Sequence, residues 1–324
     1  MVTLVTGATG LLGNNVVRQL LERGDRVRVL VRDGCDQRPL AGLDVEIARG
    51  DVRDAQQVQH AMREVRLVVH AAALVRFGWT ELEQHRAVNV HGTAHVARAA
   101  RAHGARMVHV STVDALAVGS RHRPADEETP AVGKIPSAYV VSKREAEQVV
   151  LAEVADGLDA VIVNPAFMLG PWDWKPSSGQ MLLEVARRFT PIAPTGGISL
   201  CDVRDVAQGL LAAAAQAPSG RRYILAGENL AMFSAWKLMA RVSGGGRPYL
   251  PAGPLMRVIG GAWGDLRTWV TGREGEFNSA AVRASSQFHY YTSERAQREI
   301  GYCWRPVEET VRDAWAWFRQ HGYA

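Results

Sequence analysis

Hydrophobic residues in the first two-thirds of the chain come in short runs that alternate with longer amphipathic stretches. The runs are rich in β-branched residues and predict buried strands at residues 2–5, 26–31, 45–48, 67–70, 107–110 and 160–163. Helical periodicity predicts helices at residues 13–23, 81–103 and 138–154. Because strands and helices alternate, we expect a parallel sheet covered on both faces, with right-handed crossovers. The pattern therefore predicts an α/β, doubly wound (Rossmann) fold.

The alternation loosens after Pro165. Residues 170–195 are rich in Trp, Pro and Gly, residues 202–217 predict a further helix, and residues 308–321 predict a closing amphipathic helix. We interpret residues 1–166 as the sheet-containing domain, to which residues 198–226 return. Residues 167–197 and 227–324 would then form a smaller, discontinuous C-terminal lobe.

A glycine-rich turn joins the first strand to the first helix. Gly7, Gly10 and Gly13 follow Thr6 with the spacing GxxGxxG. Glycines here allow a tight turn and let a pyrophosphate approach the backbone, while the helix N-terminus offers free amides. A simple turn is the alternative, but the position after the first strand favours a dinucleotide site. The residues expected to contact the cofactor in this turn are Gly7, Thr9, Gly10, Leu11, Leu12 and Gly13.

The end of the second predicted strand bears on the choice of cofactor. An acidic residue at this position would bind the ribose hydroxyls of NAD, whereas an arginine can pair with the 2′-phosphate of NADP. Arg32 occupies the position and Asp33 follows it. We therefore expect NADP(H), although Asp33 could turn inward or Arg32 could be simply solvated.

Tyr139 and Lys143 are four residues apart and share one face of a predicted helix. A nearby ammonium favours the phenolate and would bring the tyrosine pKa into the range needed for proton transfer. Thr112 follows the fifth predicted strand and is the candidate for orienting a substrate oxygen, with Ser111 the weaker choice. A strand-end cap is the alternative for either hydroxyl. The three candidates indicate hydride transfer between a nicotinamide and a secondary alcohol or ketone.

Several motifs together resemble the extended short-chain dehydrogenase/reductases over essentially the whole chain. They are the glycine turn, Gly50-Asp51-Val52, His70-Ala71-Ala72-Ala73, Asn89, Ser111-Thr112, Tyr139 through Lys143, and Asn164-Pro165. The resemblance implies that Asp51 and Val52 contact adenine, and that Asn89 supports the active site. It also implies that further cofactor contacts come from Ala71, Ala72, Ala73 and Pro165. His70 is read as a core histidine with satisfied hydrogen bonds.

Within that family the chain is most similar to the dihydroflavonol reductase-like branch, near the hydroxysteroid dehydrogenases. Bacterial proteins named hopanoid-associated sugar epimerases look most alike, a name that fixes no substrate. Two departures matter: Asp202 stands where many members have His, and Thr112 is followed by Val113-Asp114 instead of Asp-Glu. The second departure argues against dehydration of a sugar nucleotide.

The smaller lobe is apolar and is expected to bind the substrate. Phe167, Met168 and Trp172 are the candidate contacts, and residues 255–269 add further aromatic side chains, although packing of the lobe would explain them equally. We therefore expect a lipophilic substrate of flavonoid, steroid or terpenoid type. The alternatives are a nucleotide-sugar epimerase, which would use Arg187, Arg188 and Arg204 for a diphosphate, and a cofactor-sensing protein without catalysis.

Composition narrows the remaining possibilities. The 324 residues carry a net charge of +5 without a dense basic run, which argues against nucleic-acid binding. The three cysteines form no CxxC pair, so we expect neither a metal site nor disulfides. No apolar run reaches the roughly 20 residues that span a bilayer. The sequence predicts a cytoplasmic enzyme acting on a small molecule, with a homodimer left open.

Overall fold

A computed structural model describes residues 2–76, 78–189, 191–253, 262–265, 268–269, 271 and 278–324. Its main sheet has seven parallel strands in the order β10-β6-β5-β4-β1-β2-β3. Their bounds are β1 Val2–Thr6, β2 Arg26–Val31, β3 Glu46–Arg49, β4 Val65–His70, β5 Arg106–Val110, β6 Ala160–Pro165 and β10 Arg222–Leu225. The strand order reverses between β1 and β4, which confirms the predicted doubly wound fold.

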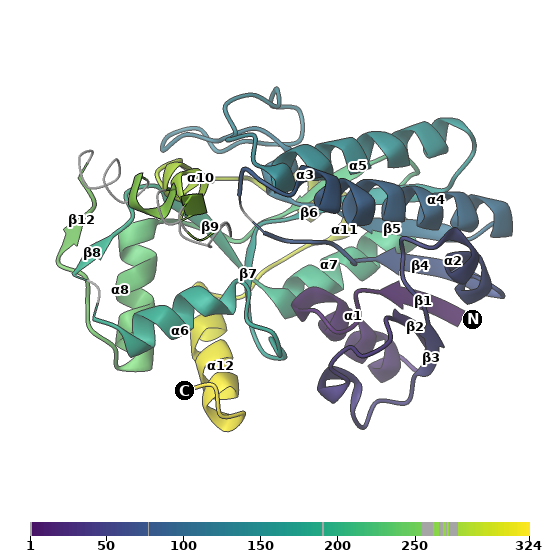
Figure 1. Cartoon of the computed structure of the whole chain (residues 1–324), viewed down its shortest axis with the longest axis horizontal. Coiled ribbons are helices and arrows are strands. Elements are labelled where there is room, and N and C mark those ends of the chain that lie inside the picture. The colour runs from purple at the N-terminus through teal and green to yellow at the C-terminus, as the bar shows by residue number, and fades with distance from the viewer. Residues whose placement is uncertain are drawn as a thin grey trace.

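Helices cover both faces of this sheet (Figure 1). One layer contains α1 Leu11–Glu22, α7 Val203–Gln216 and α11 Glu294–Ile300, and the other contains α2 Ala55–Ala61, α3 Leu82–His85, α4 Gly92–His103 and α5 Ala138–Ala155. Strands β1 and β6 are buried along their whole length because helices cover both faces of the sheet. Side-chain caps start several helices: Asp54 accepts from two amides of α2, and Ser137 accepts from Val140 N of α5.

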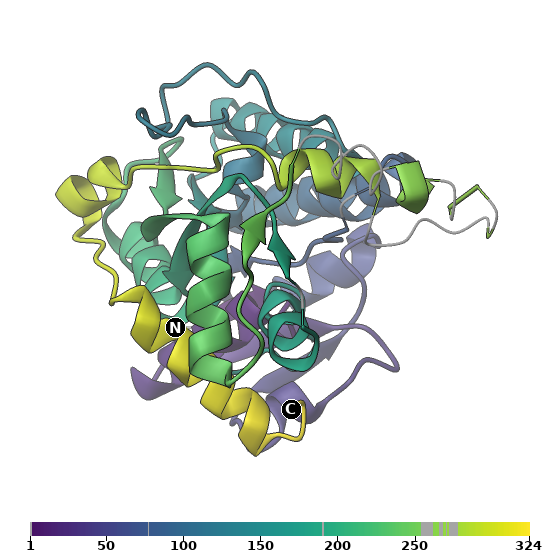
Figure 2. The same ribbon diagram turned by 90° about the vertical axis from the view of Figure 1, so that its left-hand side faces the viewer.

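The smaller lobe is built around a second, three-stranded sheet in the order β11-β9-β7. Its elements are β7 Phe167–Leu169, β9 Gly197–Asp202, β11 Glu228–Ala231, the pair β8 Ile192–Ala193 and β12 Leu250–Pro251, and helices α6 Gly179–Arg187, α8 Met232–Ser243, α10 Ser279–Ala284 and α12 Val307–Gln320. Helix α8 packs against α6 and α12, as Figure 2 shows from the side of this lobe. Leucine and aromatic side chains of these helices form a separate hydrophobic core.

The structure differs from the sequence prediction in places. The predicted helix over residues 81–103 is interrupted by a π-helical turn, Arg86–His91, between α3 and α4. Residues 198–226 are shared between the sheets, since β9 pairs in the small sheet whereas β10 pairs with β6. Helix α11, from the predicted C-terminal lobe, packs on α7 and β10. The two lobes are thus interleaved, and the exact domain limits stay a prediction.

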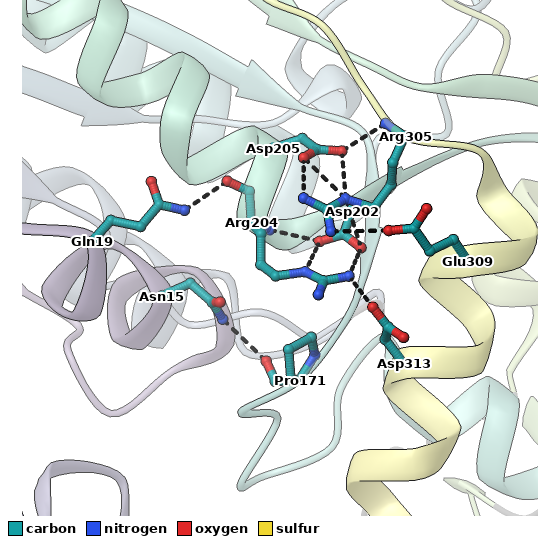
Figure 3. Close-up of polar contacts among 9 residues, drawn as sticks. All are labelled: Asn15, Gln19, Pro171, Asp202, Arg204, Asp205, Arg305, Glu309 and Asp313. Atoms are coloured by element: carbon teal, nitrogen blue, oxygen red, sulfur yellow. Dashed lines mark hydrogen bonds and ion pairs between the residues drawn. The ribbon is translucent and has the colours of Figure 1, made fainter. Parts of the chain in front are cut away.

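A cluster of buried charges joins the two lobes (Figure 3). Asp202 ends β9, is fully buried, and caps α7 by accepting from Arg204 N at 2.8 Å. Its carboxylate also binds the Arg204 guanidinium at 2.7 Å, and the same arginine reaches Asp313 of α12 at 2.6 Å. Arg305 pairs with Asp205 at 2.7 Å and lies 3.6 Å from Asp202. Asp202 is therefore the centre of an ionic junction.

Two amide side chains of α1 connect this junction to the helix that follows the glycine turn. Gln19 donates to Arg204 O at 2.8 Å, and Asn15 donates to Pro171 O at 3.1 Å (Figure 3). Helix α1 is therefore tied both to α7 and to the loop that follows β7.

Candidate active site

The glycine turn has the shape of a phosphate cradle. Gly7 has φ +74°, and a Cβ there would lie 2.6 Å from the backbone of Ala71. A Cβ on Gly13 would lie 2.2 Å from Gly7 O, so the turn and α1 approach more closely than any side chain allows. Gly10 precedes α1 and provides no side-chain cap. The first amides of α1 are therefore left for an anion, and the residues fit a dinucleotide pyrophosphate.

The remaining members of the turn lie as this fit requires. Thr9 is half-buried and Gly10 is exposed, whereas Leu11 and Leu12 begin α1 and turn their side chains into the core. Leu11 and Leu12 would thus meet a cofactor through their backbone amides. Their direct contact with a cofactor stays a prediction.

A pocket of about 400 Å³ lies at the ends of β2 and β3. Arg32 and Asp33 line it from one side and Asp51 and Arg53 from the other. Arg53 is engaged, because its guanidinium lies 2.8 Å from the Asp51 carboxylate and helps to lower the pKa of Asp51. Among the described residues, no carboxylate forms a salt bridge with Arg32. Arg32 is therefore the pocket arginine with a guanidinium available to a ligand.

The other residues that are expected to contact the cofactor lie at the carboxyl ends of the strands. Val52 is buried against Gly92, and Ala71 to Ala73 directly follow β4. Ala71 N donates to Thr6 O at 3.2 Å, which fixes this segment beside the glycine turn. Pro165 is the last residue of β6 and is buried. The structure thus brings these residues to the carboxyl ends of strands β3, β4 and β6 of one parallel sheet, the end at which α/β sheets bind ligands.

The three catalytic candidates meet at the ends of β5 and α5. Tyr139 is 6% exposed, and the Thr112 side chain is one of the groups that act on its pKa. Thr112 caps a 3₁₀ turn, Val113–Ala115, by accepting from the Asp114 amide at 3.2 Å. Lys143 follows one turn after Tyr139 on α5, and its Nζ donates to Val110 O at 2.7 Å. Thr112 is therefore a cap in this structure, and its role in orienting a substrate oxygen stays a prediction.

Burial controls the electrostatics of this pair. It raises the pKa of Tyr139 well above its usual value, the charge of Asp114 raises it further, and the hydrogen bond from Thr112 opposes both. Burial also lowers the pKa of Lys143 to about 8, against the opposing charge of Glu147. The expectation that Lys143 brings the tyrosine pKa down is thus outweighed within the protein, because desolvation of a buried phenolate is the larger effect. The protein environment keeps Tyr139 a phenol, a proton donor.

A buried network that the sequence did not indicate supports Lys143. Glu147 lies one turn further along α5 and is 3% exposed. It pairs with Arg222 of β10 at 2.6 Å and accepts from Asn164 Nδ2 at 2.7 Å. Asn164 also donates to Thr112 O at 2.8 Å, so one amide connects the lysine side of the site to the threonine side. The only available signal was the spacing of four residues from Lys143 to Glu147.

Two residues singled out by the family resemblance have structural partners. Asn89 lies in the π-helical turn, accepts from Leu74 N at 2.7 Å and donates to Ser142 Oγ at 3.0 Å. It therefore holds the segment after β4 against α5. His70 is hydrogen-bonded to Thr6 and Thr93, and burial lowers its pKa to about 3. This is the core histidine that the sequence predicts.

The expected substrate contacts do not share one position. Phe167 and Met168 form β7, directly after the end of β6, and both are half-buried. Trp172 lies elsewhere: its ring packs against Trp174 and Trp317, and the Arg18 guanidinium stacks on it at 3.3 Å. That aromatic contact joins α1 to α12 and accounts for Trp172 through packing. Phe167 and Met168 remain the candidates for substrate.

The segment at residues 255–269 lies largely outside the described residues, Met256 and Ile259 included. Trp263 and Trp269 are described and are exposed. No role in a pocket is assigned to them.

The arginines considered for a sugar-nucleotide diphosphate are engaged elsewhere. Arg204 belongs to the ionic junction, Arg187 donates to Tyr323 O, and Arg188 pairs with Glu184 on its own helix at 3.3 Å. Within the described ranges there is also no group of three or more His, Cys, Asp or Glu side chains arranged to bind a metal ion. None of the helices in the same ranges is long and apolar enough to cross a membrane.

Comparison with known proteins agrees with this geometry. A sequence model described as the NAD dependent epimerase/dehydratase family matches residues 3–226. The chain is 34% identical to a protein named sterol demethylase protein B from Methylococcus capsulatus, covering 99% of each. It is 35% identical to a putative dihydroflavonol 4-reductase from Synechocystis, covering 98% of the chain and 95% of the relative. The crystal structure of gox2253 superposes with a TM-score of 0.86 at 35% identity, covering 99% of this chain and 98% of the other.

Proposed function

Because the chain belongs to the NAD-dependent epimerase/dehydratase family, we propose that it is an NADP(H)-dependent oxidoreductase of lipophilic ketones and secondary alcohols. The observation that carries the proposal is that Tyr139 and Lys143 share the start of α5 beside Thr112, at the same end of the sheet as the glycine turn. The cofactor, when bound, supplies or accepts the hydride. The protein's own groups would bind it, orient the substrate and move one proton.

Each group has one task in this mechanism. The glycine turn and the N-terminus of α1 would hold the pyrophosphate. Tyr139 would donate its phenolic proton to the oxygen of the ketone during reduction and take it back during oxidation. Thr112 would hold that oxygen by a hydrogen bond, and the ammonium of Lys143 would hold the nicotinamide ribose and favour the phenolate after proton donation.

Preference for NADP(H) is supported by the pocket at the ends of β2 and β3. A 2′-phosphate is best recognised by a guanidinium that has no other anionic partner. Arg32 comes closer to this condition than Arg53, because its charge acts on Asp51 without a salt bridge among the described residues, whereas Arg53 is paired with Asp51.

Reduction of a lipophilic compound is supported over sugar-nucleotide epimerisation. A diphosphate substrate needs free cations, but Arg187, Arg188 and Arg204 are bound to other groups of the protein. Relatives of similar length are named for a sterol and for a dihydroflavonol, both lipophilic. The half-buried apolar side chains of β7 suit such a ligand.

The cofactor preference is tested by fluorescence titration with NADPH and NADH. We expect NADPH to bind at least about tenfold more tightly, a difference of about 1.4 kcal/mol, and Arg32→Ala to remove the difference. Arg38→Ala is the matched control, because Arg38 is a nearby exposed arginine that pairs with Asp36 and does not line the pocket. Equal binding of NADH by the wild type would contradict the proposed role of Arg32.

The reaction is tested with a panel of lipophilic ketones by following consumption of free NADPH. We expect turnover by the wild type, and its loss in Tyr139→Phe with cofactor binding retained. An epimerase consumes no NADPH, so cofactor binding without net consumption on any ketone would favour epimerisation. Turnover that survives in Tyr139→Phe would refute the assigned proton donor.

A further inference from the structure

A second group of charges lies next to the catalytic residues and is built from three separate parts of the chain. Asp114 belongs to the 3₁₀ turn after β5, Lys134 to the loop at residues 116–137, and His289 to the segment after α10. We call these three residues the Asp114 cluster. Lys134 Nζ lies 2.7 Å from Asp114 Oδ1 and 2.7 Å from His289 Nδ1, and its side chain is 2% exposed.

The hydrogen bonds fix the charge of each member. His289 Nε2 donates to Ala284 O at 2.9 Å, so Nδ1 is free to accept from the Lys134 ammonium. Burial and the charge of Lys134 both lower the pKa of His289, which is therefore neutral. Burial would raise the pKa of Asp114, but the Lys134 ammonium and the Thr112 side chain lower it. The cluster thus holds one carboxylate and one ammonium in a fixed arrangement.

This arrangement lies next to the threonine and the tyrosine of the site. The Asp114 amide donates to Thr112 Oγ1 at 3.2 Å, so the cluster fixes the turn that carries Thr112. The charge of Asp114 raises the pKa of Tyr139, and the Thr112 side chain lowers it. A carboxylate held in this place therefore disfavours a phenolate at Tyr139.

We propose that Asp114, clamped by Lys134 and His289, is a positioning residue that acts through Thr112 to keep Tyr139 in its phenol form. The inference rests on the proposed function, in which Tyr139 donates a proton to the ketone oxygen. With Asp114 in place, Tyr139 keeps its proton, which ketone reduction requires, up to a higher pH than burial alone would allow.

Other charged or titratable groups face these residues and must be separated from the effect. Lys143 lies one turn along α5 and has a pKa of about 8. Arg144 of the same helix donates to Ala115 O at 2.9 Å, and Tyr291 lies near Lys134 with its ring 5.4 Å from Nζ. The His85 ring is 6.4 Å from that of Tyr139, and burial lowers its pKa.

Asparagine at position 114 separates charge from shape. Asp114→Asn keeps an oxygen that accepts from Lys134 but removes the negative charge. Removing the charge lowers the pKa of Tyr139. Because reduction requires the phenol, the rate of reduction should begin to fall at a lower pH than in the wild type. Oxidation requires the phenolate, and its rise with pH moves to lower pH for the same reason.

The experiment is a titration of the full-length protein with NADP⁺ bound, following phenolate absorbance in the ultraviolet. Subtracting the matching Tyr139→Phe variant isolates the signal of Tyr139. We expect Asp114→Asn to lower the midpoint by about one pH unit or more, and the alkaline limb of kcat/KM for ketone reduction to move with it. Asp126→Asn is the matched control: this residue lies in the same loop, but its carboxylate accepts from Thr129 and should leave the midpoint unchanged.

Lys134→Met provides a second test that does not depend on how Asp114→Asn folds. Removing the ammonium leaves the buried carboxylate without its counter-charge, so Asp114 takes up a proton and the midpoint of Tyr139 should fall, as it does in Asp114→Asn. An unchanged midpoint in Asp114→Asn or Lys134→Met, even with lower thermal stability, would reduce the cluster to a structural role. Turnover that survives in Tyr139→Phe would refute the proposed function instead, so the two failures are distinguishable.

Discussion

The ionic junction between the lobes allows a stability prediction whose size follows from burial. Asp202 is fully buried between Arg204 and Arg305, and removing one partner of a buried ion pair costs about 3–5 kcal/mol. Here the side chains of both arginines are about one quarter exposed and keep other carboxylates, namely Asp313 and Asp205. We therefore expect Asp202→Asn to lower the free energy of unfolding by about 2–3 kcal/mol.

Two further variants separate the contribution of the helix cap from that of the buried ion pairs. Asp202 also caps α7 through Arg204 N, and asparagine caps a helix as well as aspartate does. Asp202→Ala should therefore cost about 1 kcal/mol more than Asp202→Asn. The matched control is Asp313→Asn, whose side chain is 39% exposed and whose ion pair should contribute at most about 1 kcal/mol.

Urea denaturation followed by circular dichroism measures these differences, provided that the slope with denaturant is the same for all four proteins. A loss below about 0.5 kcal/mol in Asp202→Asn, or a loss equal to that of Asp313→Asn, would refute the reasoning. It would mean that hydrophobic packing alone joins the lobes and that the buried charges add nothing to it.

Other positions give predictions that are simpler to test. Gly13→Ala places a Cβ 2.2 Å from a backbone oxygen of the turn and should weaken NADPH binding at least about tenfold by fluorescence titration. Gly253→Ala, with no atom within 4 Å, should bind normally. Alkylation followed by mass spectrometry should show NADPH protecting Cys35, which lines the Arg32 pocket, but not the exposed Cys303; equal protection would contradict that placement. Glu147→Gln removes a charge that raises the pKa of the catalytic lysine, so the pH profile of kcat/KM should move to lower pH, and an unmoved profile would contradict this.

The parts of the fold that were predictable from sequence are those with local signals. Strands β1, β2 and β6 are almost entirely buried, and mostly apolar runs mark them in the sequence. The cradle was predictable because Gly7 and Gly13 follow a strand at a fixed spacing, and Tyr139 and Lys143 because helical periodicity places them on one face. The short strands of the smaller lobe gave no comparable signal, since β7 and β11 are half-buried and only three or four residues long.

Long-range pairing is the reason that the rest of the site was not predictable. Lys134 and His289 are separated by 155 positions, and neither lies in a motif. Asp114 was noted in the sequence only as a departure from the family's Asp-Glu pair. What makes it informative is its contact with Thr112, a property of the folded chain. The roles of Trp172 and Arg204 changed for the same reason, because their partners come from α12.

Several of these long-range partners come from the part of the chain beyond residue 226. The family model ends at residue 226, and the residues before it contain the cradle, Thr112, Tyr139 and Lys143. Beyond residue 226 lie His289, which binds Lys134, and Arg305, which binds Asp205. A buried carboxylate remains ionised only beside compensating groups. Arg305, from the C-terminal third, therefore completes the charge balance of Asp205, and His289 accepts a hydrogen bond from the buried Lys134 ammonium. If the Asp114 cluster acts as proposed, substitution of His289 should change the protonation of Tyr139 without touching cofactor or substrate.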